Sequence, residues 1–457
     1  MDTVSTFAML MSTFDPALTV PTAANLAVLA RGAVLSPRKR TVAACLMAAW
    51  PWVRKGYDTY NDLLRRARLN TLWLASLLLE LGLRLVPEEA PVTLAVDETL
   101  VRRWGPRVRG RDPVRSCRSR HAVNPGHRWV TLSLIVSLPY MGRVLALPIV
   151  SALYTPRSRP SRNRSTRLYR RHRTVGDLAL LLMRLIVRRT GDRSLILVGD
   201  GAYATHQLSK YLQPDSPVRS LRGVSLVSRF YFDGATYKIP APYSGRGRPR
   251  IVGEKLPSPR AVVDNPETEW ERAVLRWYGR QQKLMWLCSR TGLWYKGGEG
   301  AKWIRWVVVR DPAGKRRDEV FFTTDRKLSA AEIVETYVGR WSIETTFEEA
   351  REHLGLETLR NWSSTAVRRS VPLLLGLYSM IVIWFHLTVE KPENHCQQRP
   401  WYAKAHLTFS DMLAAARSDI LGELLYKHPG SDRCEQLLWR LSCGSAGPAR
   451  RRKRNAA

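Results

Sequence analysis

The sequence predicts a mixed α/β protein that carries an antiparallel β insertion and helical regions at both ends. Three observations support this class. Short apolar runs alternate with amphipathic helical segments between residues 92 and 230. Residues 231–324 are rich in Trp, Tyr, Arg, Gly and Pro and contain only short apolar runs. Towards both ends of the chain, apolar residues recur at helical spacing instead.

Composition points to a polyanionic partner. The 457 residues, enough for two or three domains, carry a formal net charge of +34 at pH 7. That excess favours nucleic acid first and an anionic membrane second. None of the six cysteines forms a C-x-x-C pair, so neither a zinc ribbon nor a disulfide framework is indicated. We therefore expect a reducing, cytoplasmic location.

Membrane targeting is not expected. The N-terminus lacks a basic region followed by an apolar run, which a signal peptide would need. Val371–Leu387 is the longest uncharged apolar stretch and is at the short limit for a membrane span. A helix buried on all sides is the expected structure, with no membrane partner.

Residues 1–88 read as a helical region, and Ser36–Pro37 suits a helix start. The region is either a DNA-binding and positioning module or a plain bundle with solvated basic residues. Its predicted helices are Pro37–Trp50, Tyr57–Arg68 and Leu69–Leu83, and its basic residues include Arg38, Lys39, Arg40, Arg65, Arg66 and Arg68.

Residues 89–230 read as the first part of a catalytic core, in the order β-β-β-α-β-α-β. Thr205 suits the N-cap of the second helix. The predicted strands are Val92–Val96, Trp129–Leu138, Arg143–Val150, Leu195–Val198 and Val224–Phe230, and the helices are Val175–Arg188 and His206–Leu212.

Two acids follow separate strands of this core. Asp97 and Asp200 each come at a predicted strand exit, where open α/β sheets place their chemistry. A capping or turn role is the alternative for each acid taken alone. Glu98 is expected on the opposite side of its strand, and Asp112 lies in an arginine-rich loop.

Residues 231–324 are expected to form antiparallel strands inserted into the core. The predicted strands are Val274–Trp277, Leu284–Cys288, Trp303–Val309 and Val320–Thr323. Trp294, Trp303 and Trp306 could stack on a flipped base, or they could belong to the core or to cross-strand pairs.

Residues 325–390 complete the core and contain the most informative stretch, which is predicted to be one helix over 337–351. On a helical period, one face carries Tyr337, Arg340, Glu344, Glu348 and Arg351, beside an apolar stripe. Guanidiniums and a phenol suit phosphate oxygens, and a carboxylate suits a metal ion. The alternative is a solvated face with i,i+4 ion pairs.

The acids suggest phosphodiester chemistry. Two divalent ions held by carboxylates from different elements can neutralise a phosphate and activate a water or hydroxyl. Hard oxygen ligands favour Mg²⁺ or Mn²⁺. Asp97, Asp200 and one of Glu344 or Glu348 are the candidate ligands.

Basic segments elsewhere suit DNA. Gly245–Arg250 resembles an AT-hook core, whose Arg246 and Arg248 would enter a minor groove, although a basic turn is the alternative. Residues 391–457 are expected to hold the helices Ser410–Leu425 and Arg433–Leu441 and a basic tail at 450–454. One loop concentrates arginines that would follow phosphates: Arg157, Arg159, Arg162, Arg164, Arg167, Arg170, Arg171 and Arg173.

Taken together, the motifs resemble bacterial insertion-sequence DDE transposases of the IS-four and IS-seven-hundred-one-like groups, which have a Tyr-Arg-Glu-Lys signature. The stretches that carry the resemblance are Leu94–Asp97, Leu197–Tyr203, the Tyr337-x2-Arg340-x3-Glu344-x6-Arg351 signature and the following Leu354–Glu357. The order of elements resembles an RNase H-like core.

The resemblance implies specific roles. Asp97, Asp200 and Glu344 would form the metal-binding triad, and Tyr337, Arg340 and Arg351 would contact DNA near the cleaved phosphate. Arg351 replaces the lysine of the signature, so a planar fork stands where the family has a point charge.

The implied function is cut-and-paste cleavage and strand transfer at transposon ends, with two Mg²⁺ or Mn²⁺ ions. The partners would be duplex DNA with terminal inverted repeats, target DNA and a second copy of the chain in a synaptic complex. The protein would be cytoplasmic and associated with the nucleoid. A nuclease or resolvase on the same core, or an inactive DNA-binding relic, are the alternatives.

Overall fold

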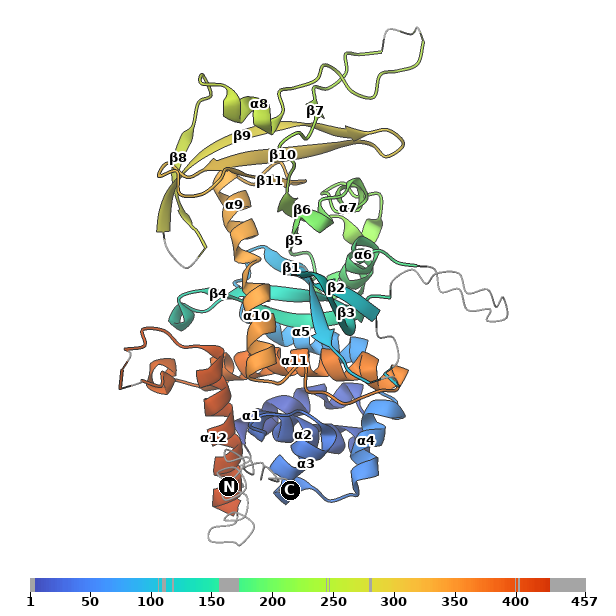
Figure 1. Ribbon diagram of the computed structural model, residues 1–457, viewed down its shortest axis with the longest axis vertical. Helices are drawn as coiled ribbons and strands as arrows, with labels where there is room; N and C mark the ends of the chain where they lie inside the picture. The colour runs from blue at the N-terminus through green and yellow to red at the C-terminus, as the bar shows by residue number, and fades with distance from the viewer. Residues whose placement is uncertain are drawn as a thin grey trace, which may run out of the picture. The chain divides into compact units, whose positions relative to one another are not determined.

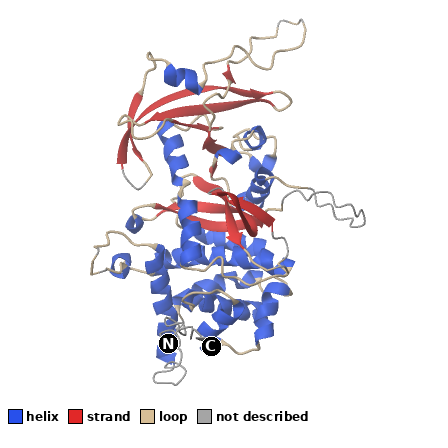
Figure 2. Cartoon of the chain, viewed as in Figure 1, coloured by secondary structure: helices blue, strands red, loops and turns tan. Residues whose placement is uncertain are grey.

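The computed structural model describes residues 5–105, 107–108, 112–116, 119–155, 172–243, 245, 247–278, 282–398, 400–401 and 403–427. It is a mixed α/β protein, as predicted (Figure 2). The chain divides into two compact units. We call Met1–Leu78, Arg102–Arg111 and Glu348–Ala457 the helical unit, and Leu79–Val101 and Asp112–Phe347 the sheet unit.

An eleven-stranded sheet organises the sheet unit (Figure 1). Its main path runs β2-β3-β1-β5-β6-β11-β10-β9-β7, with β4 paired to β3 and β8 paired to β9. The strands are β1 Val92–Arg102, β2 Asp112–Ser116, β3 Ser119–Ser137, β4 Val144–Leu153, β5 Leu195–Gly199, β6 Val224–Arg229, β7 Thr236–Tyr237, β8 Glu271–Arg276, β9 Gln282–Lys296, β10 Gly300–Arg310 and β11 Glu319–Thr323.

The centre of the sheet is parallel and buried. β1 pairs with β5, and β5 with β6, in parallel register, and Val96 lies opposite Gly199. The prediction for Asp97 was wrong in one respect, because β1 does not end at Val96. Thr99 and Val101 continue the buried alternation, so Asp97 lies inside the strand.

The β insertion is antiparallel, as predicted, and it extends the same sheet. β11 pairs with β6 and joins the insertion to the parallel centre. Trp294 and Trp306 are 7% and 1% exposed, so they are core residues and unsuited to stacking on a flipped base. Trp303 is half-buried, with the Arg326 guanidinium 5.4 Å from its ring centroid.

Helices of the sheet unit begin at side-chain caps. The Thr205 hydroxyl accepts the Leu208 N–H, as predicted, and Ser329 and Glu332 form a capping box. The helices are α6 Val175–Ile186, α7 His206–Tyr211, α8 Pro259–Asp264, α9 Ala330–Gly339 and the first residues of α10 Ser342–Glu352, and the 3₁₀ turns are η3 Pro139–Met141, η4 Val187–Arg189, η5 Gly201–Tyr203 and η6 Arg219–Leu221.

The single helix predicted over 337–351 is two helices, α9 and α10. The N–H groups of Arg340, Trp341 and Ile343 bond to carbonyls three residues earlier, which is tighter than the α-helical spacing. The Ser342 hydroxyl also donates to the Gly339 carbonyl at 2.8 Å. The chain therefore turns tightly at Arg340 and Trp341, but the Arg340 side chain still contacts Tyr337 and Glu344, its neighbours on the predicted face.

The helical unit packs α1, α2, α3, α4, α11 and α12 together. α2 is an addition to the prediction, and α3 begins at Val42 because Thr41 caps it; Ser36 instead donates to the Lys39 carbonyl. The elements are α1 Thr6–Met11, η1 Ser12–Ala17, α2 Val20–Leu35, α3 Val42–Ala48, η2 Trp50–Trp52, α4 Tyr57–Arg65, the start of α5 Thr71–Leu83, α11 Ser364–Thr388, η7 Pro392–His395 and α12 Phe409–Lys427.

Within the described part of the chain, α11 alone is long and apolar enough to cross a membrane. Of its most apolar window, 67% is buried by the protein itself. Tyr378, Ile381 and Phe385 on this helix are fully buried. These observations support the predicted core helix.

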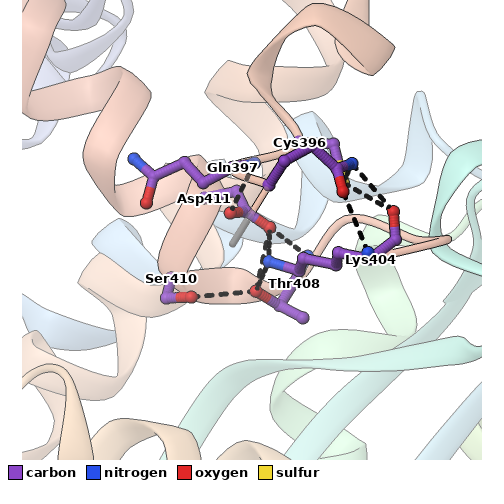
Figure 3. A network of polar contacts seen from close by, with 7 residues as sticks. Cys396, Gln397, Lys404, Thr408, Ser410 and Asp411 are labelled. Carbon is purple, nitrogen blue, oxygen red and sulfur yellow. Dashed lines mark hydrogen bonds and ion pairs between the residues drawn. The ribbon is translucent and has the colours of Figure 1, made fainter. Parts of the chain in front are cut away.

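A polar network anchors the segment before α12 (Figure 3). Asp411 accepts the Thr408 N–H at 2.8 Å and also binds the Lys404 ammonium. Gln398 bonds the Lys404 backbone through both its amide atoms. The predicted helix Arg433–Leu441 and the basic tail lie outside the described residues.

Arg40 is a structural residue, contrary to the solvated role considered for it. Its guanidinium donates to the carbonyls of Ala33 at 2.7 Å, Arg38 at 3.0 Å and His353 at 2.6 Å. The residue is only 3% exposed, and burial lowers the pKa of Arg40 to about 10. One buried guanidinium thus binds carbonyls from α2, from the residues just before Arg40 and from the distant residue His353.

Arg40→Ala should lower the free energy of unfolding by about 3 kcal/mol, because three buried carbonyls would lose a charged donor. Exposed Arg38 provides the matched control, and Arg38→Ala should leave the melting temperature unchanged. Thermal unfolding by circular dichroism measures both. Equal melting temperatures for the two variants would contradict a structural role for Arg40.

Candidate active site

Arg340 joins two acids that are distant in the sequence. Its Nη1 lies 2.7 Å from Asp97 Oδ2, across 243 residues, and its Nη2 lies 3.1 Å from Glu344 Oε1. β1 supplies Asp97, the turn between α9 and α10 supplies Arg340, and the first turn of α10 supplies Glu344. From this turn, one guanidinium binds both carboxylates.

This guanidinium is held in a buried position. The Arg340 side chain is 7% exposed and lies 5.5 Å from the ring centroid of Tyr337, which stacks on Phe321 at 4.2 Å. Arg340 Nε is buried and has no hydrogen-bond partner among the described residues. Although burial opposes it, the negative charge of Asp97 and Glu344 raises the pKa of Arg340.

Asp97 is the acid whose ionisation is most perturbed. Burial raises the pKa of Asp97 to about 6, and the charges of Asp200 and Glu344 add to the increase. Arg340 and the Glu98 N–H, which bonds Asp97 Oδ1 at 2.7 Å, act in the opposite direction. The three predicted acids thus share one electrostatic neighbourhood.

Asp200 follows β5 directly, as predicted. Its Oδ1 accepts the Ala202 N–H at 2.9 Å, which caps η5. Its carbonyl accepts the Ser228 hydroxyl at 2.7 Å. These bonds fix the Asp200 backbone and one carboxylate oxygen at the end of the parallel strands.

The acids do not close around a metal-sized space. In the part of the chain that is described, no three His, Cys, Asp or Glu side chains are placed to hold a metal ion together. A cation already lies between two of them, because Arg340 binds Asp97 and Glu344. The donor set still fits the group that the sequence predicts, since hard carboxylate oxygens are the ligands of Mg²⁺ and Mn²⁺.

Sequence reasoning underrated Glu98. Its carboxylate pairs with Arg128 at 3.3 Å, and burial raises the pKa of Glu98, with a further contribution from the charge of Asp200. The Arg128 guanidinium also lies 5.4 Å from the Tyr154 ring centroid. The charges of Glu98 and Asp200 therefore interact, and the prediction that Glu98 lies on the opposite side of its strand stays a prediction.

The remaining predicted site residues fall in different surroundings. Tyr337 is 4% exposed, which suits support of Arg340. Arg351 belongs to the helical unit, where its Nε lies 3.8 Å from Glu357 Oε1 and burial lowers the pKa of Arg351. Glu348 is exposed.

The basic segments are described only in part. Arg248 is exposed, in a turn where the Tyr243 hydroxyl donates to the Gly247 carbonyl at 2.6 Å. The left-handed φ values of Gly245 and Gly247, +84° and +74°, fit a tight basic turn. Arg246 and the arginines from Arg157 to Arg171 lie outside the described residues.

Asp97→Asn should stabilise the protein at pH 8. Because burial raises the pKa of Asp97 from 3.8 to about 6, its ionisation destabilises the fold, fully above pH 6 and not at all below about pH 4. The asparagine variant should therefore be more stable at pH 8, by at most about 3 kcal/mol, and match the parent near pH 4.

Asp311→Asn is a control at a residue whose ionisation stabilises the fold, in contrast to that of Asp97. Asp311 bonds Lys283 at 2.6 Å, and that bond lowers the pKa of Asp311, so its stabilisation is present at neutral pH and is lost as pH falls. Melting temperatures at pH 4 and pH 8 compare the variants, and Asp311→Asn should be less stable than the parent at both, because its stabilisation is lost only below about pH 4. A less stable Asp97→Asn at pH 8 would mean that the Arg340 pair outweighs burial.

Comparison with known proteins identifies the family of this chain. The family model described as DDE superfamily endonuclease matches residues 13–286. The match includes Asp97 and Asp200 and ends before Glu344. No curated protein matches the chain. Because the family match spans more than half of the 457 residues, this protein belongs to the DDE superfamily endonucleases.

Proposed function

We propose that this protein is a DNA transposase that cuts and joins DNA strands at transposon ends. The observation that carries the proposal is the Arg340 bridge between Asp97 and Glu344, beside Asp200. It links Glu344, the third acid of the signature, to Asp97, which lies within the family match. A nuclease-type function on DNA follows from the family alone; strand transfer and end specificity are the proposal.

The strand order supports an RNase H-like core. The path β4-β3-β1-β5-β6 has three neighbouring parallel strands, β1, β5 and β6, with Asp97 on the first and Asp200 after the second. The β insertion lies between β6 and α9 and so precedes Glu344 in the chain. This arrangement fits the insertion-sequence class that the motifs resemble.

Asp97, Asp200 and Glu344 would hold divalent cations, two Mg²⁺ or Mn²⁺ in this proposal. Such cations, when bound, supply charge neutralisation at the scissile phosphate and activation of a water or hydroxyl. The carboxylates supply the oxygen donors from three separate elements. Because burial raises the pKa of Asp97 only to about 6, its carboxylate can be available as a ligand at neutral pH.

Arg340 has a second task in this scheme. If Asp97 and Glu344 held a divalent cation, the Arg340 guanidinium would give up its bonds to them and would be a planar donor for a DNA phosphate. Tyr337 would then support the Arg340 stem, since its ring is buried against Phe321. Arg351 would contact the DNA near the cleaved phosphate, as the resemblance implies, and the exposed Arg248 would enter a minor groove.

The proposed partners follow from the charge of the chain and from the transposases that its motifs resemble. Duplex DNA with terminal inverted repeats, target DNA and a second copy of the chain in a synaptic complex are the expected assembly. A net charge of +34 supports DNA as the polyanion. The expected location is the bacterial cytoplasm, in association with the nucleoid.

Glu344→Gln should abolish DNA cleavage and preserve DNA binding. The substitution keeps the shape and removes a ligand charge, so transition-state stabilisation by a bound cation is lost. We expect a fall in the cleavage rate of at least about 10³-fold. The measurement uses supercoiled plasmid bearing the native element ends, with Mg²⁺ or with EDTA, beside a filter-binding assay.

Glu348→Gln is the matched control, because Glu348 is exposed one helical turn further along α10. It should cleave at the parental rate. Parental cleavage by Glu344→Gln would sink the assignment of this site. Cleavage without joined products in the parent protein would favour a nuclease or resolvase over a transposase.

DNA affinity should depend steeply on salt. Removal of one arginine that binds a phosphate should reduce the log–log slope by about 0.9. Replacement of Arg157, Arg159, Arg162 and Arg164 by serine should therefore flatten the slope and weaken binding to all sequences alike. Fluorescence anisotropy between about 50 and 200 mM salt gives the slope. An unchanged slope would show that this loop does not contact phosphates.

A further inference from the structure

A buried hydroxyl without a partner lies beside the candidate site. Tyr203 is the last residue of η5, three residues after Asp200, and its side chain is fully buried. Among the described residues, its Oη has no hydrogen-bond partner. A buried, unpaired hydroxyl is destabilising, and a phenylalanine would fill the same space without that penalty.

The backbone fixes this ring next to the acid-bearing strands. The Tyr203 N–H bonds the Asp200 carbonyl at 3.0 Å. A Cβ added to Gly199 would lie 2.8 Å from the Tyr203 ring, so the ring packs directly on that glycine. Gly199 in turn lies opposite Val96, the residue before Asp97. The ring is thus held where β5 ends and where β1 carries its acids.

Charges around the hydroxyl favour a neutral donor. Burial raises the pKa of Tyr203 far above its usual value, and the negative charges of Glu98, Asp97 and Asp200 raise it further. The phenol therefore keeps its proton at any physiological pH. A neutral hydroxyl that faces carboxylate charge can donate a hydrogen bond to one of them.

Other buried tyrosines show that an unpaired hydroxyl is not the rule here. Tyr378, also fully buried, donates to Glu349 at 2.6 Å. Tyr60, 1% exposed, accepts the Arg54 N–H at 3.2 Å. Tyr203 differs in having three acids around it and a hydrogen bond to none, while Arg340 and Arg128 neutralise Asp97 and Glu98.

We propose that Tyr203 is a positioning residue of the candidate metal site, whose hydroxyl donates to a carboxylate of the Asp97, Glu98 and Asp200 group in the cation-loaded protein. The inference rests on the proposed function, because it requires that these acids bind a divalent cation. A donor to a ligating carboxylate fixes its orientation, and loss of such a donor typically lowers metal affinity 10–100-fold.

The test compares Tyr203→Phe with Tyr378→Phe in the full chain. Calorimetric titration with Mn²⁺, without DNA, measures metal affinity, and thermal unfolding without Mn²⁺ measures stability. Tyr203→Phe should keep or raise the melting temperature and bind Mn²⁺ 10–100-fold more weakly. Tyr378→Phe should do the reverse, with a lower melting temperature and parental Mn²⁺ affinity, because its hydroxyl is already paired.

The outcomes separate this inference from the function on which it rests. If the parent binds Mn²⁺ and Tyr203→Phe binds it equally well, the role of Tyr203 is wrong and the proposed function stands. If the parent binds no Mn²⁺, the role of Tyr203 and the proposed function both fail. If Tyr203→Phe does not fold, the hydroxyl has a structural partner in the free protein, which also overturns the inference.

Discussion

One buried guanidinium decides how the acidic centre of this protein is arranged. Asp97, Asp200 and Glu344 come from a strand, a strand end and a helix, and their charges would repel one another in a site of low polarity. Arg340 offsets that repulsion by binding two of them at once. Its own burial is tolerable because two carboxylates surround it, although its Nε remains unpaired among the described residues. The turn between α9 and α10 and the stacked pair of Tyr337 and Phe321 both serve this one residue.

The order of elements could be predicted because it depends on local patterns. The strands of the core, the antiparallel insertion, α6, α7 and the buried α11 all follow from apolar periodicity and turn residues. Asp200 follows β5 as predicted, but the surroundings of Asp97 and Arg340 could not be predicted. β1 runs past Asp97, where Thr99 and Val101 remain buried. α9 ends at Gly339 through short-range bonds that apolar periodicity does not reveal, including the bond from the Ser342 hydroxyl to the Gly339 carbonyl. The Arg340 pair with Asp97 spans 243 residues, a separation at which no periodic pattern is informative.

The sequence also did not show which basic residues are buried and which are exposed. Arg38, Lys39 and Arg40 are consecutive cations, yet only Arg40 is buried and bound by carbonyls. α2 escaped prediction because apolar residues cover most of its surface and leave no polar stripe to define a face. Gly32 of α2 shows how closely this helix packs on α3, since a Cβ at Gly32 would lie 2.1 Å from the Cys45 carbonyl oxygen. The close contact between α2 and α3, which only the folded structure reveals, therefore requires a residue without a side chain at Gly32.

The β insertion belongs to the same sheet as the acids, and this limits how far the chain could be shortened. β11 lies between β6 and β10, so the insertion is hydrogen-bonded into the sheet that carries the acids. Loss of residues 231–310 would leave β11 as an unpaired edge strand that exposes Val320, Phe321 and Phe322, which are now fully buried. An uncovered apolar edge invites pairing between molecules. A shortened form of this chain would therefore be prone to aggregation even if every acid were retained.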